Sequence, residues 1–196
     1  MTDEEKGLIK QAQNGDSASF GKLYDRYAER IYRFIFLKTG HKSDAEDLLH
    51  EVFLSGWRTV HTYELRGGIP FTSWLYRIAG NRVIDWYRAQ KHGVSLDEMT
   101  ESNTLPVELA STSHTALLDA LDRGFEIETV MKGIRGLGDV EQTVVLMRFV
   151  EDLSPEEVGH AIQKTAGAVR LIQHRALAKL KKNIERAHDR TITRTA

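Results

Sequence analysis

The sequence predicts an all-α protein: two small helical domains joined by an acidic flexible linker, the second a four-helix domain that contains a helix-turn-helix. Apolar residues recur every three or four positions along most of the 196 residues. No run of alternating β-branched residues bounded by turns indicates a strand. Between the helical parts this periodicity is lost and acidic residues dominate, which places the domains at 1–92 and 126–196 and the linker at 93–125.

Two helices are expected at the start of the first domain. The first spans about 16–38, with Asp16 as its N-cap, because its apolar side chains form one stripe: Phe20, Leu23, Tyr24, Tyr27, Ile31, Phe34 and Ile35. The second spans about 43–60, because Ser43 and Glu46 have the spacing of a capping box. Its predicted buried side consists of Ala45, Leu48, Leu49, Val52 and Gly56.

The third helix of this domain should follow a loop at 61–70, because two glycines and Pro70 cannot continue a helix, whereas a proline suits a first helical turn. Over 71–88 aromatic residues alternate with arginines: Trp74, Tyr76, Trp86 and Tyr87 with Arg77, Arg82 and Arg88. Aromatic rings can stack on unpaired bases, and guanidinium groups can hold phosphates. The alternative, aromatic packing between helices, would account for Trp86 and Tyr87.

The linker separates regions of different charge. Residues 91–127 carry two basic and seven acidic groups around Pro106, whereas 128–196 carry twelve basic and nine acidic groups. Within this last region, 164–196 holds nine basic groups against two acidic ones. Such an excess is typical of a surface that binds phosphate, although a solvated helix face would have the same composition.

Four helices are expected in the second domain, near 126–134, 140–150, 154–162 and 165–184. The last two, joined by a tight polar turn, are typical of a helix-turn-helix, which lays its second helix in the DNA major groove. Ser154 and Glu157 have capping-box spacing, and the Thr165 hydroxyl group can cap the last helix. A purely structural helical hairpin is the alternative.

The last helix has an inward and an outward face. At 100° per residue, the inward face consists of Val169, Ile172, Ala176 and Leu180. The outward face consists of Gly167, Arg170, Leu171, His174 and Arg175. Arginine can bond guanine through two parallel hydrogen bonds, which contribute about 1–3 kcal/mol of discrimination between bases. The outward face is therefore the candidate for contact with DNA bases.

An acidic ridge is expected on the second helix of the first domain, where Asp44, Asp47 and Glu51 fall at i, i+3 and i+7. Such a ridge either keeps the protein soluble or docks a partner. A di-metal site would need a Glu with a His three residues later, and the nearest pair, Glu46 and His50, is four apart. No metal ion and no bound cofactor are implied.

Composition narrows the class of protein further. The absence of cysteine excludes a disulfide scaffold, a zinc ribbon and a thiol nucleophile, and it suits a reducing compartment. The N-terminus opens with acidic residues, and no run approaches the roughly 18 apolar residues that a membrane span needs. We expect a cytoplasmic protein without membrane insertion. A hydrolase or metal enzyme has little support, because paired His motifs and Gly-rich phosphate loops are lacking.

Three segments carry a family resemblance: DAEDLLHEVF at 44–53, FTSWLYRIAGNRVIDWYR at 71–88 and VVLMRFVEDLSPEEVGHAIQKTAGAVRLIQHRALAKL at 144–180. In this order they resemble the extracytoplasmic function (ECF) subfamily of bacterial RNA polymerase sigma factors. The first is similar to the family's core-polymerase-binding helix and the second to its helix for promoter melting and the −10 element. The third is similar to its −35-reading domain. The resemblance covers nearly the whole chain outside the linker.

The resemblance implies three sets of site residues. The core-polymerase-binding set is Asp47, His50 and Glu51, with His50 where the family usually has Gln. The −10 DNA-binding and melting set, beside a loop at 61–70 that would capture a flipped base, is Tyr63, Phe71, Trp74, Arg77, Asn81 and Arg88. The −35 set is Thr165, Arg170, Leu171, His174 and Arg175. The turn departs from the family, with Gln163 and Lys164 where a Gly and an apolar residue are usual.

The resemblance further implies a sigma factor, not an enzyme, that binds core polymerase and directs promoter-specific initiation through −10 and −35 recognition. Its partners would be bacterial RNA polymerase core, promoter DNA and an anti-sigma factor. The alternative is a stand-alone helix-turn-helix transcriptional regulator, which would bind duplex DNA tightly by itself. The net charge of +3 over 128–196 instead predicts weak binding by an isolated domain.

Overall fold

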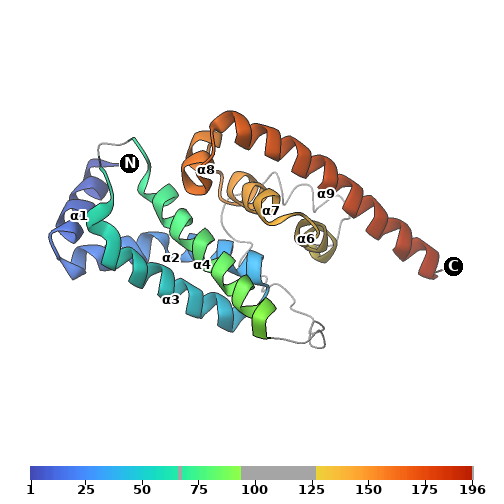
Figure 1. The fold of residues 1–196 in the computed structure, drawn as a ribbon, viewed down its shortest axis with the longest axis horizontal. Coiled ribbons are helices and arrows are strands. Elements are labelled where there is room, and N and C mark those ends of the chain that lie inside the picture. Colours follow the sequence, from blue (N-terminus) through green and yellow to red (C-terminus); the bar gives the residue numbers. More distant parts are fainter. Residues whose placement is uncertain (66–67, 94–126, 196) are drawn as a thin grey trace. The chain divides into compact units, whose positions relative to one another are not determined.

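The computed structural model describes residues 1–65, 68–93 and 127–195, and the regular structure in these ranges is entirely helical. The all-α prediction is therefore confirmed. Helices α1–α4 form one compact unit, and α6, α7 and α9 form the body of another (Figure 1). The predicted linker at 93–125 lies outside the described residues, apart from residue 93 at the end of α4.

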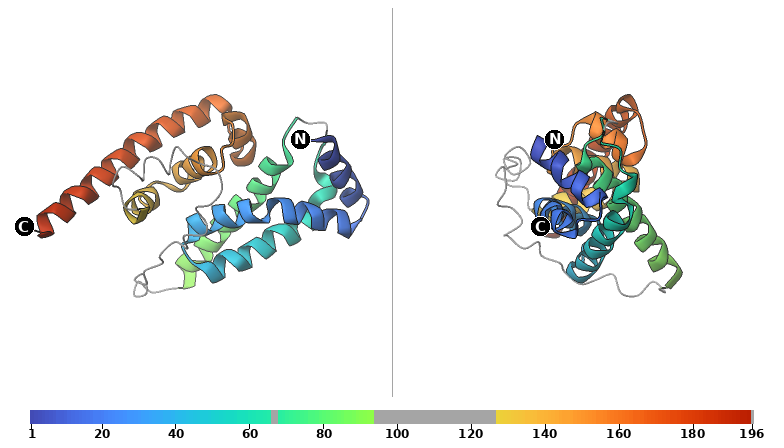
Figure 2. Two further views of the ribbon diagram at one scale, coloured as in Figure 1. Left: turned by 180° about the vertical axis from the view of Figure 1, so that it is seen from behind. Right: turned by 90° about the vertical axis from the view of Figure 1, so that its left-hand side faces the viewer.

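The described residues of the first unit form four α-helices and one 3₁₀ turn: α1 (Asp3–Gln13), α2 (Ser17–Thr39), α3 (Lys42–Thr59), η1 (Val60–Thr62) and α4 (Phe71–Gly93). Helices α2, α3 and α4 pack against one another, and α1 packs against α2 and η1 (Figure 2). The three helices predicted from periodicity are confirmed as α2, α3 and α4. Helix α1 was not predicted.

The signals for α1 are present in the sequence. The Thr2 hydroxyl group accepts a hydrogen bond from the Glu5 amide at 3.2 Å, which is the cap of this helix. Leu8, Ile9 and Ala12, spaced by one, three and four positions, are buried. The acidic residues of the first turn suit the positive end of the helix dipole, although in sequence they resemble a polar tail.

Of the two predicted caps in this unit, one is confirmed and one is wrong. The Asp16 carboxylate accepts from the Ala18 amide at 3.1 Å, as predicted. Ser43 lies inside the first turn of α3, and His41 is the residue that precedes the helix. The reason is Gly40, whose φ of 77° ends α2 in a left-handed conformation and lets α3 begin at once.

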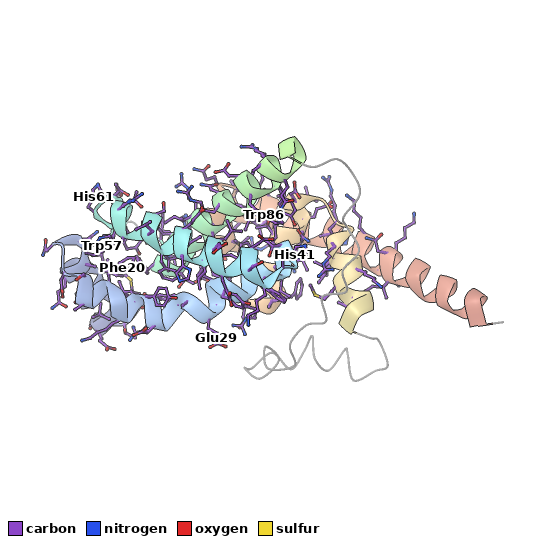
Figure 3. The ribbon with its side chains drawn as sticks, turned by 90° about the horizontal axis from the view of Figure 1, so that it is seen from below. Phe20, Glu29, His41, Trp57, His61 and Trp86 are labelled. Carbon is purple, nitrogen blue, oxygen red and sulfur yellow. The ribbon has the colours of Figure 1, made fainter. Side chains whose placement is uncertain are left out.

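An aromatic and aliphatic core joins α2, α3 and α4. The Phe20 ring lies 5.2 Å from the Trp57 ring, which Figure 3 shows close together where α2 begins and α3 ends. Farther along, the Phe34 and Tyr76 rings meet edge to face at 5.4 Å. The hydrophobic residues of α4 that are 0% exposed recur at helical spacing along one face: Leu75, Tyr76, Ala79 and Val83. One face of α4 is therefore committed to the core, and the other is left to solvent.

The second unit contains α6 (Ile127–Arg135), α7 (Asp139–Val145), the π-helical turn η3 (Leu146–Val150), α8 (Pro155–Ile162) and α9 (Ala166–Thr195). The four predicted helices are confirmed, with the second divided into α7 and η3. Helix α9 continues beyond the predicted end at about residue 184. The core of the second unit includes five residues that are each at most 1% exposed: Ile134, Val144, Val158, Val169 and Ala176.

Both predicted caps of the helix-turn-helix are formed. The Ser154 amide donates to the Glu157 carboxylate at 2.7 Å, and the Glu157 amide donates to the Ser154 hydroxyl oxygen at 3.1 Å. This reciprocal pair is a capping box. At α9, the Ala168 amide donates to the Thr165 hydroxyl oxygen at 3.2 Å. The beginnings of α8 and α9 are thus fixed by residues close to them in sequence.

The turn between α8 and α9 depends on two residues. Gln163 has a φ of 56°, so a glutamine occupies a left-handed position that usually favours glycine. The Lys164 amide then donates to the Gly159 carbonyl oxygen at 2.9 Å. A Cβ on Gly159 would lie 2.5 Å from the Lys164 carbonyl oxygen. The tight turn therefore requires glycine at 159 even though it tolerates glutamine at 163.

Replacing Gly159 with Ala should destabilise the second unit by about 1–3 kcal/mol, because the added methyl group must displace main-chain atoms. Urea unfolding followed by circular dichroism measures the change. Gly167→Ala is the matched control, since a Cβ there would meet nothing closer than 4.0 Å. The control should be neutral or slightly stabilising. Equal stability of Gly159→Ala and the wild type would contradict this account of the turn.

Candidate nucleic-acid interface

The outward face of α9 has the predicted orientation. Val169 and Ala176 are fully buried, whereas Arg170, His174 and Arg175 are exposed. Exposed with them is Leu171, which at 52% is the most exposed large apolar residue of α9 among those described. An apolar side chain between arginines suits contact with a thymine methyl group. Contact of Arg170, Leu171, His174 and Arg175 with DNA bases stays a prediction.

The cations of this surface differ in their partners. The Arg170 guanidinium donates to the Glu156 carboxylate of α8 at 2.7 Å, and both side chains are more than half exposed. A hydrogen bond from its own backbone amide and the one from Arg170 lower the pKa of Glu156. Lys179 is bound to Glu141 of α7 at 2.6 Å. Arg175 forms no ion pair with any described residue, so it can reach a ligand without breaking one.

The acidic ridge on α3 is formed by Asp47 and Glu51, both exposed, with His50 exposed beside them. Asp44, which the spacing also assigned to the ridge, is half-buried. The residues of α3 that face the core, from Ala45 to Gly56, are buried as predicted. The ridge is therefore a free surface of the unit and not part of its packing.

Leu54 belongs to the ridge, although it was not predicted. Its side chain is 50% exposed. At 100° per residue it falls within about 20° of Asp47, between His50 and Glu51. The helical periodicity of the sequence could have identified Leu54, because it places this apolar residue outside the buried face of α3. Acidic groups around an exposed leucine form a better protein-binding surface than acidic groups alone.

A second exposed stripe runs along α4. Arg77, Asn81 and Arg88 are exposed, and Trp74 is half-buried at the start of the stripe. Arg88 lies 3.5 Å from Asp85 on the same stripe. The stripe therefore presents one aromatic ring, two guanidinium groups, one amide and the Asp85 carboxylate on the side of α4 that faces away from the core.

Trp86 and Tyr87 of α4 make aromatic packing contacts, which was the alternative to base stacking. The rings of Trp86 and Tyr87 meet edge to face at 4.9 Å. The Tyr87 hydroxyl group donates to the Lys38 carbonyl oxygen of α2. Tyr87 therefore helps to join α4 to α2, and Trp86 packs against Tyr87 on the same helix.

Tyr63 and Phe71 of the predicted −10 set are buried in this structure, so their contact with DNA stays a prediction. Tyr63 is 5% exposed and Phe71 is 1% exposed. Their rings meet edge to face at 5.2 Å, and the Tyr63 ring also lies 5.6 Å from Trp74. The reason is packing: aromatic residues on both sides of the loop close the end of the core. Of the aromatic residues in the predicted −10 set, Trp74 alone keeps substantial exposure.

Two buried tyrosines have raised pKa values. Burial, then a hydrogen bond to the Glu5 carboxylate at 2.5 Å, raises the pKa of Tyr27. Burial, then the nearby negative charge of Glu5, raises the pKa of Tyr63 to about 12. Both phenols therefore remain neutral hydrogen-bond donors at physiological pH.

The described residues offer no cluster of three side chains suited to a metal ion. Nor does any helix among them combine the length and the apolarity of a membrane span.

Comparison with known families assigns both units. Residues 23–93 match the family model for Sigma-70 region 2, which covers α3, η1, α4 and most of α2. Residues 133–182 match the model for Sigma-70 region 4, which includes the helix-turn-helix. Both regions belong to one class of protein, the sigma-70 factors, and they follow in numerical order along the chain. Helix α1 lies outside both matches.

Curated relatives narrow the class. The chain is 34% identical over 180 residues to the ECF RNA polymerase sigma factor BldN of Streptomyces coelicolor, covering 88% of this chain and 63% of BldN. It is 28% identical over 181 residues to the ECF RNA polymerase sigma factor SigW of Bacillus subtilis, covering 91% of this chain and 96% of SigW. The chain belongs to the ECF subfamily of RNA polymerase sigma factors.

Solved structures have the same fold. CnrH, determined in complex with the cytosolic domain of CnrY, matches with a TM-score of 0.67 and 21% identity, covering 93% of this chain and 98% of CnrH. The sigma factor RpoE of Bartonella quintana, determined with the anti-sigma factor NepR, matches with a TM-score of 0.65 and 14% identity, covering 85% and 96% of the two chains.

The raised tyrosine pKa values predict a loss of stability in alkali. An unfolded tyrosine ionises near pH 10. Below that pH the phenols are neutral in both the folded and the unfolded chain, so the buried tyrosines contribute their full share to the free energy of unfolding. Above pH 10 the unfolded chain releases protons that the folded chain keeps, and the free energy of unfolding should fall until about pH 12.

Urea unfolding between pH 8 and pH 12 measures this fall. Tyr27→Phe removes one ionisable phenol, so this variant should start less stable but lose less free energy over the same interval. An identical slope for the variant and the wild type would contradict the raised pKa of Tyr27.

Proposed function

We propose that the protein is a dissociable promoter-specificity subunit of bacterial RNA polymerase, and not an enzyme. The observation that carries this proposal is the order of the two matched regions in one chain, each with an exposed charged surface whose chemistry suits its partner. The relatives named as ECF RNA polymerase sigma factors support the same function. In this function the first unit binds the polymerase core and the −10 element, and the second binds the −35 element.

The α3 ridge is the proposed contact with the polymerase core. Asp47 and Glu51 supply negative charge one helical turn apart, and Leu54 supplies apolar area beside them on the same face. Charge complementarity accelerates encounter and sets orientation, whereas burial of an apolar anchor contributes to residence time. His50, exposed on the same face, can donate or accept a hydrogen bond in place of the amide that the family usually carries there.

The α4 stripe is the proposed contact with separated bases of the −10 element. Trp74 can stack on a base, Asn81 can bond to its edge, and Arg77 and Arg88 can hold phosphates. A flipped base costs a few kcal/mol of lost stacking, which such contacts offset. This assigns the stripe to strand opening and not to the first recognition of the duplex.

The outward face of α9 is the proposed contact with the −35 element. Thr165 caps the helix whose first turns enter the major groove, which keeps Arg170, Leu171, His174 and Arg175 in a fixed orientation. Arg170 must exchange Glu156 for DNA, whereas Arg175 needs no such exchange. We further propose an anti-sigma factor as a regulatory partner, since RpoE was determined with one.

Asp47→Arg with Glu51→Arg should abolish association with core polymerase while leaving the fold intact, because both side chains are exposed. Fluorescence titration of a labelled chain with core measures the affinity. The matched control is Asp25→Arg with Glu29→Arg, an exposed pair with the same spacing and the same change in charge on α2. Unchanged core affinity in the folded α3 variant would remove the docking role.

Arg77→Ala and Asn81→Ala should leave formation of the closed promoter complex nearly intact and slow strand opening, since both lose contacts with unpaired bases. Permanganate footprinting of the −10 thymines follows opening. Lys22→Ala, which removes an exposed cation of α2, should open normally. If the two α4 variants instead fail to bind duplex but open normally once bound, the melting role is wrong.

Arg170→Ala and Arg175→Ala should each cost about 1–3 kcal/mol, or roughly 5- to 150-fold in affinity, if the residue reads a base. The loss should fall on one −35 position. Lys181→Ala, in which an exposed side chain suited to phosphate is removed, should weaken all promoters alike. Transcription from a library with each −35 base randomised separates these outcomes. A uniform loss in both arginine variants would make α9 an electrostatic anchor.

A further inference from the structure

We infer that Tyr63 is a positioning residue of the −10 loop, whose hydroxyl group joins the two ends of that loop, and that Gln13 of α1 holds Tyr63 in place. The inference rests on the proposed function, in which the loop between η1 and α4 receives a flipped base. It gives roles to a buried tyrosine and to a helix outside the matched sigma-70 regions.

A single hydrogen bond, here called the clasp, crosses the loop. The Tyr63 hydroxyl group donates to the carbonyl oxygen of Ile69 at 2.5 Å, which ties together two positions six residues apart. The direction of the hydroxyl group is fixed, because the ring packs edge-on against Phe71 at 5.2 Å and tilted against Trp74 at 5.6 Å. A closed loop has fewer conformations than an open one, so less order must be created when a base enters.

Gln13 fixes the other end of Tyr63. Its side-chain amide donates to the Tyr63 carbonyl oxygen at 2.7 Å and to the Val60 carbonyl oxygen at 3.1 Å. A primary amide has two N–H groups, so one side chain can supply both bonds. Val60 is the first residue of η1 and Tyr63 is the residue that follows it, so Gln13 helps to determine where the chain leaves this turn and enters the loop.

Helix α1 is anchored well enough to act as this support. The Tyr27 hydroxyl group of α2 donates to the Glu5 carboxylate at 2.5 Å in the buried interior. The Ser19 hydroxyl group of α2 donates to the Gln11 side-chain oxygen at 2.6 Å. Two bonds from α2 thus orient α1, and Gln13 at its last turn reaches the loop.

The clasp ends beside the proposed base-binding stripe. Trp74 touches the Tyr63 ring on one side and is half-exposed on the other, and Arg77 and Asn81 follow on the same stripe of α4. Loss of the clasp should therefore disturb the entry of the base without disturbing the α3 ridge or α9. The step affected is strand opening, while core binding and duplex recruitment are spared.

The test uses Tyr63→Phe, which keeps the ring and removes the clasp. A promoter is first selected by transcription with the wild-type holoenzyme, and fragments of it are made with 2-aminopurine at successive −10 positions. Each variant is then assembled with core into holoenzyme and mixed with these fragments. The fluorescence rise on flipping should be about tenfold slower in Tyr63→Phe, the factor expected for one lost hydrogen bond. Core affinity should be unchanged. Gln13→Met should show the same defect, and Gln13→Lys, which keeps a donor, should restore part of the rate.

The matched control is Tyr87→Phe, which removes a phenol hydroxyl group that is likewise bonded to a main-chain carbonyl oxygen. Tyr87 lies toward the far end of α4 from the loop. This control variant should flip the base at the wild-type rate. A wild-type rate in Tyr63→Phe and Gln13→Met overturns the clasp, and so does an equal slowing in Tyr63→Phe and Tyr87→Phe, which would indicate general destabilisation. Absence of any core-dependent fluorescence rise in the wild type contradicts the proposed function itself, and the clasp falls with it.

Discussion

The packing of one apolar face from each of α2, α3 and α4 into a common core is the constraint on which the first unit depends. Because Leu75, Tyr76, Ala79 and Val83 are committed to that core, the arginines and the asparagine of α4 must face solvent. The same commitment on α3 leaves Asp47, Glu51 and Leu54 outside. The proposed binding surfaces are thus the helix faces that the core does not use. The second unit repeats this logic on α9, where burial of Val169 and Ala176 sends Arg170 and Arg175 outward.

Much of this arrangement could be predicted from the sequence, because it depends on periodicity and on local capping. The stripe from Phe20 to Ile35, the capping box at Ser154 and the cap at Thr165 are local signals, and the structure forms them as expected. The outward face of α9 follows from the helical period alone once its start is known. The acidic ridge was likewise predictable as a surface, although the function proposed for it rests on the resemblance to a family and on the matched region.

What could not be predicted depends on contacts between residues far apart in the chain. The family resemblance assigned Tyr63 and Phe71 to the −10 set, and no local pattern showed that both rings close the end of the core, where residues on both sides of the loop meet. Ser43 has the right spacing for a cap, but the left-handed Gly40 starts α3 earlier. The role of α1 was hidden for the same reason: Gln13 reaches carbonyl groups 47 and 50 residues away, and no local pattern signals such a bond. Long-range hydrogen bonds of this kind determine loop geometry, which is where function differs between similar folds.

The central claim is that the two units act on DNA through the polymerase and not alone. Transcription by purified bacterial core on a library of random duplexes, with and without the chain, tests it most directly. The account predicts transcripts that appear only when the chain is present, from templates that share two upstream sequence blocks, and it predicts weak, salt-sensitive duplex binding by the chain alone. Tight, sequence-specific duplex binding without core, together with no chain-dependent transcript, would contradict it and would indicate a regulator that acts by itself.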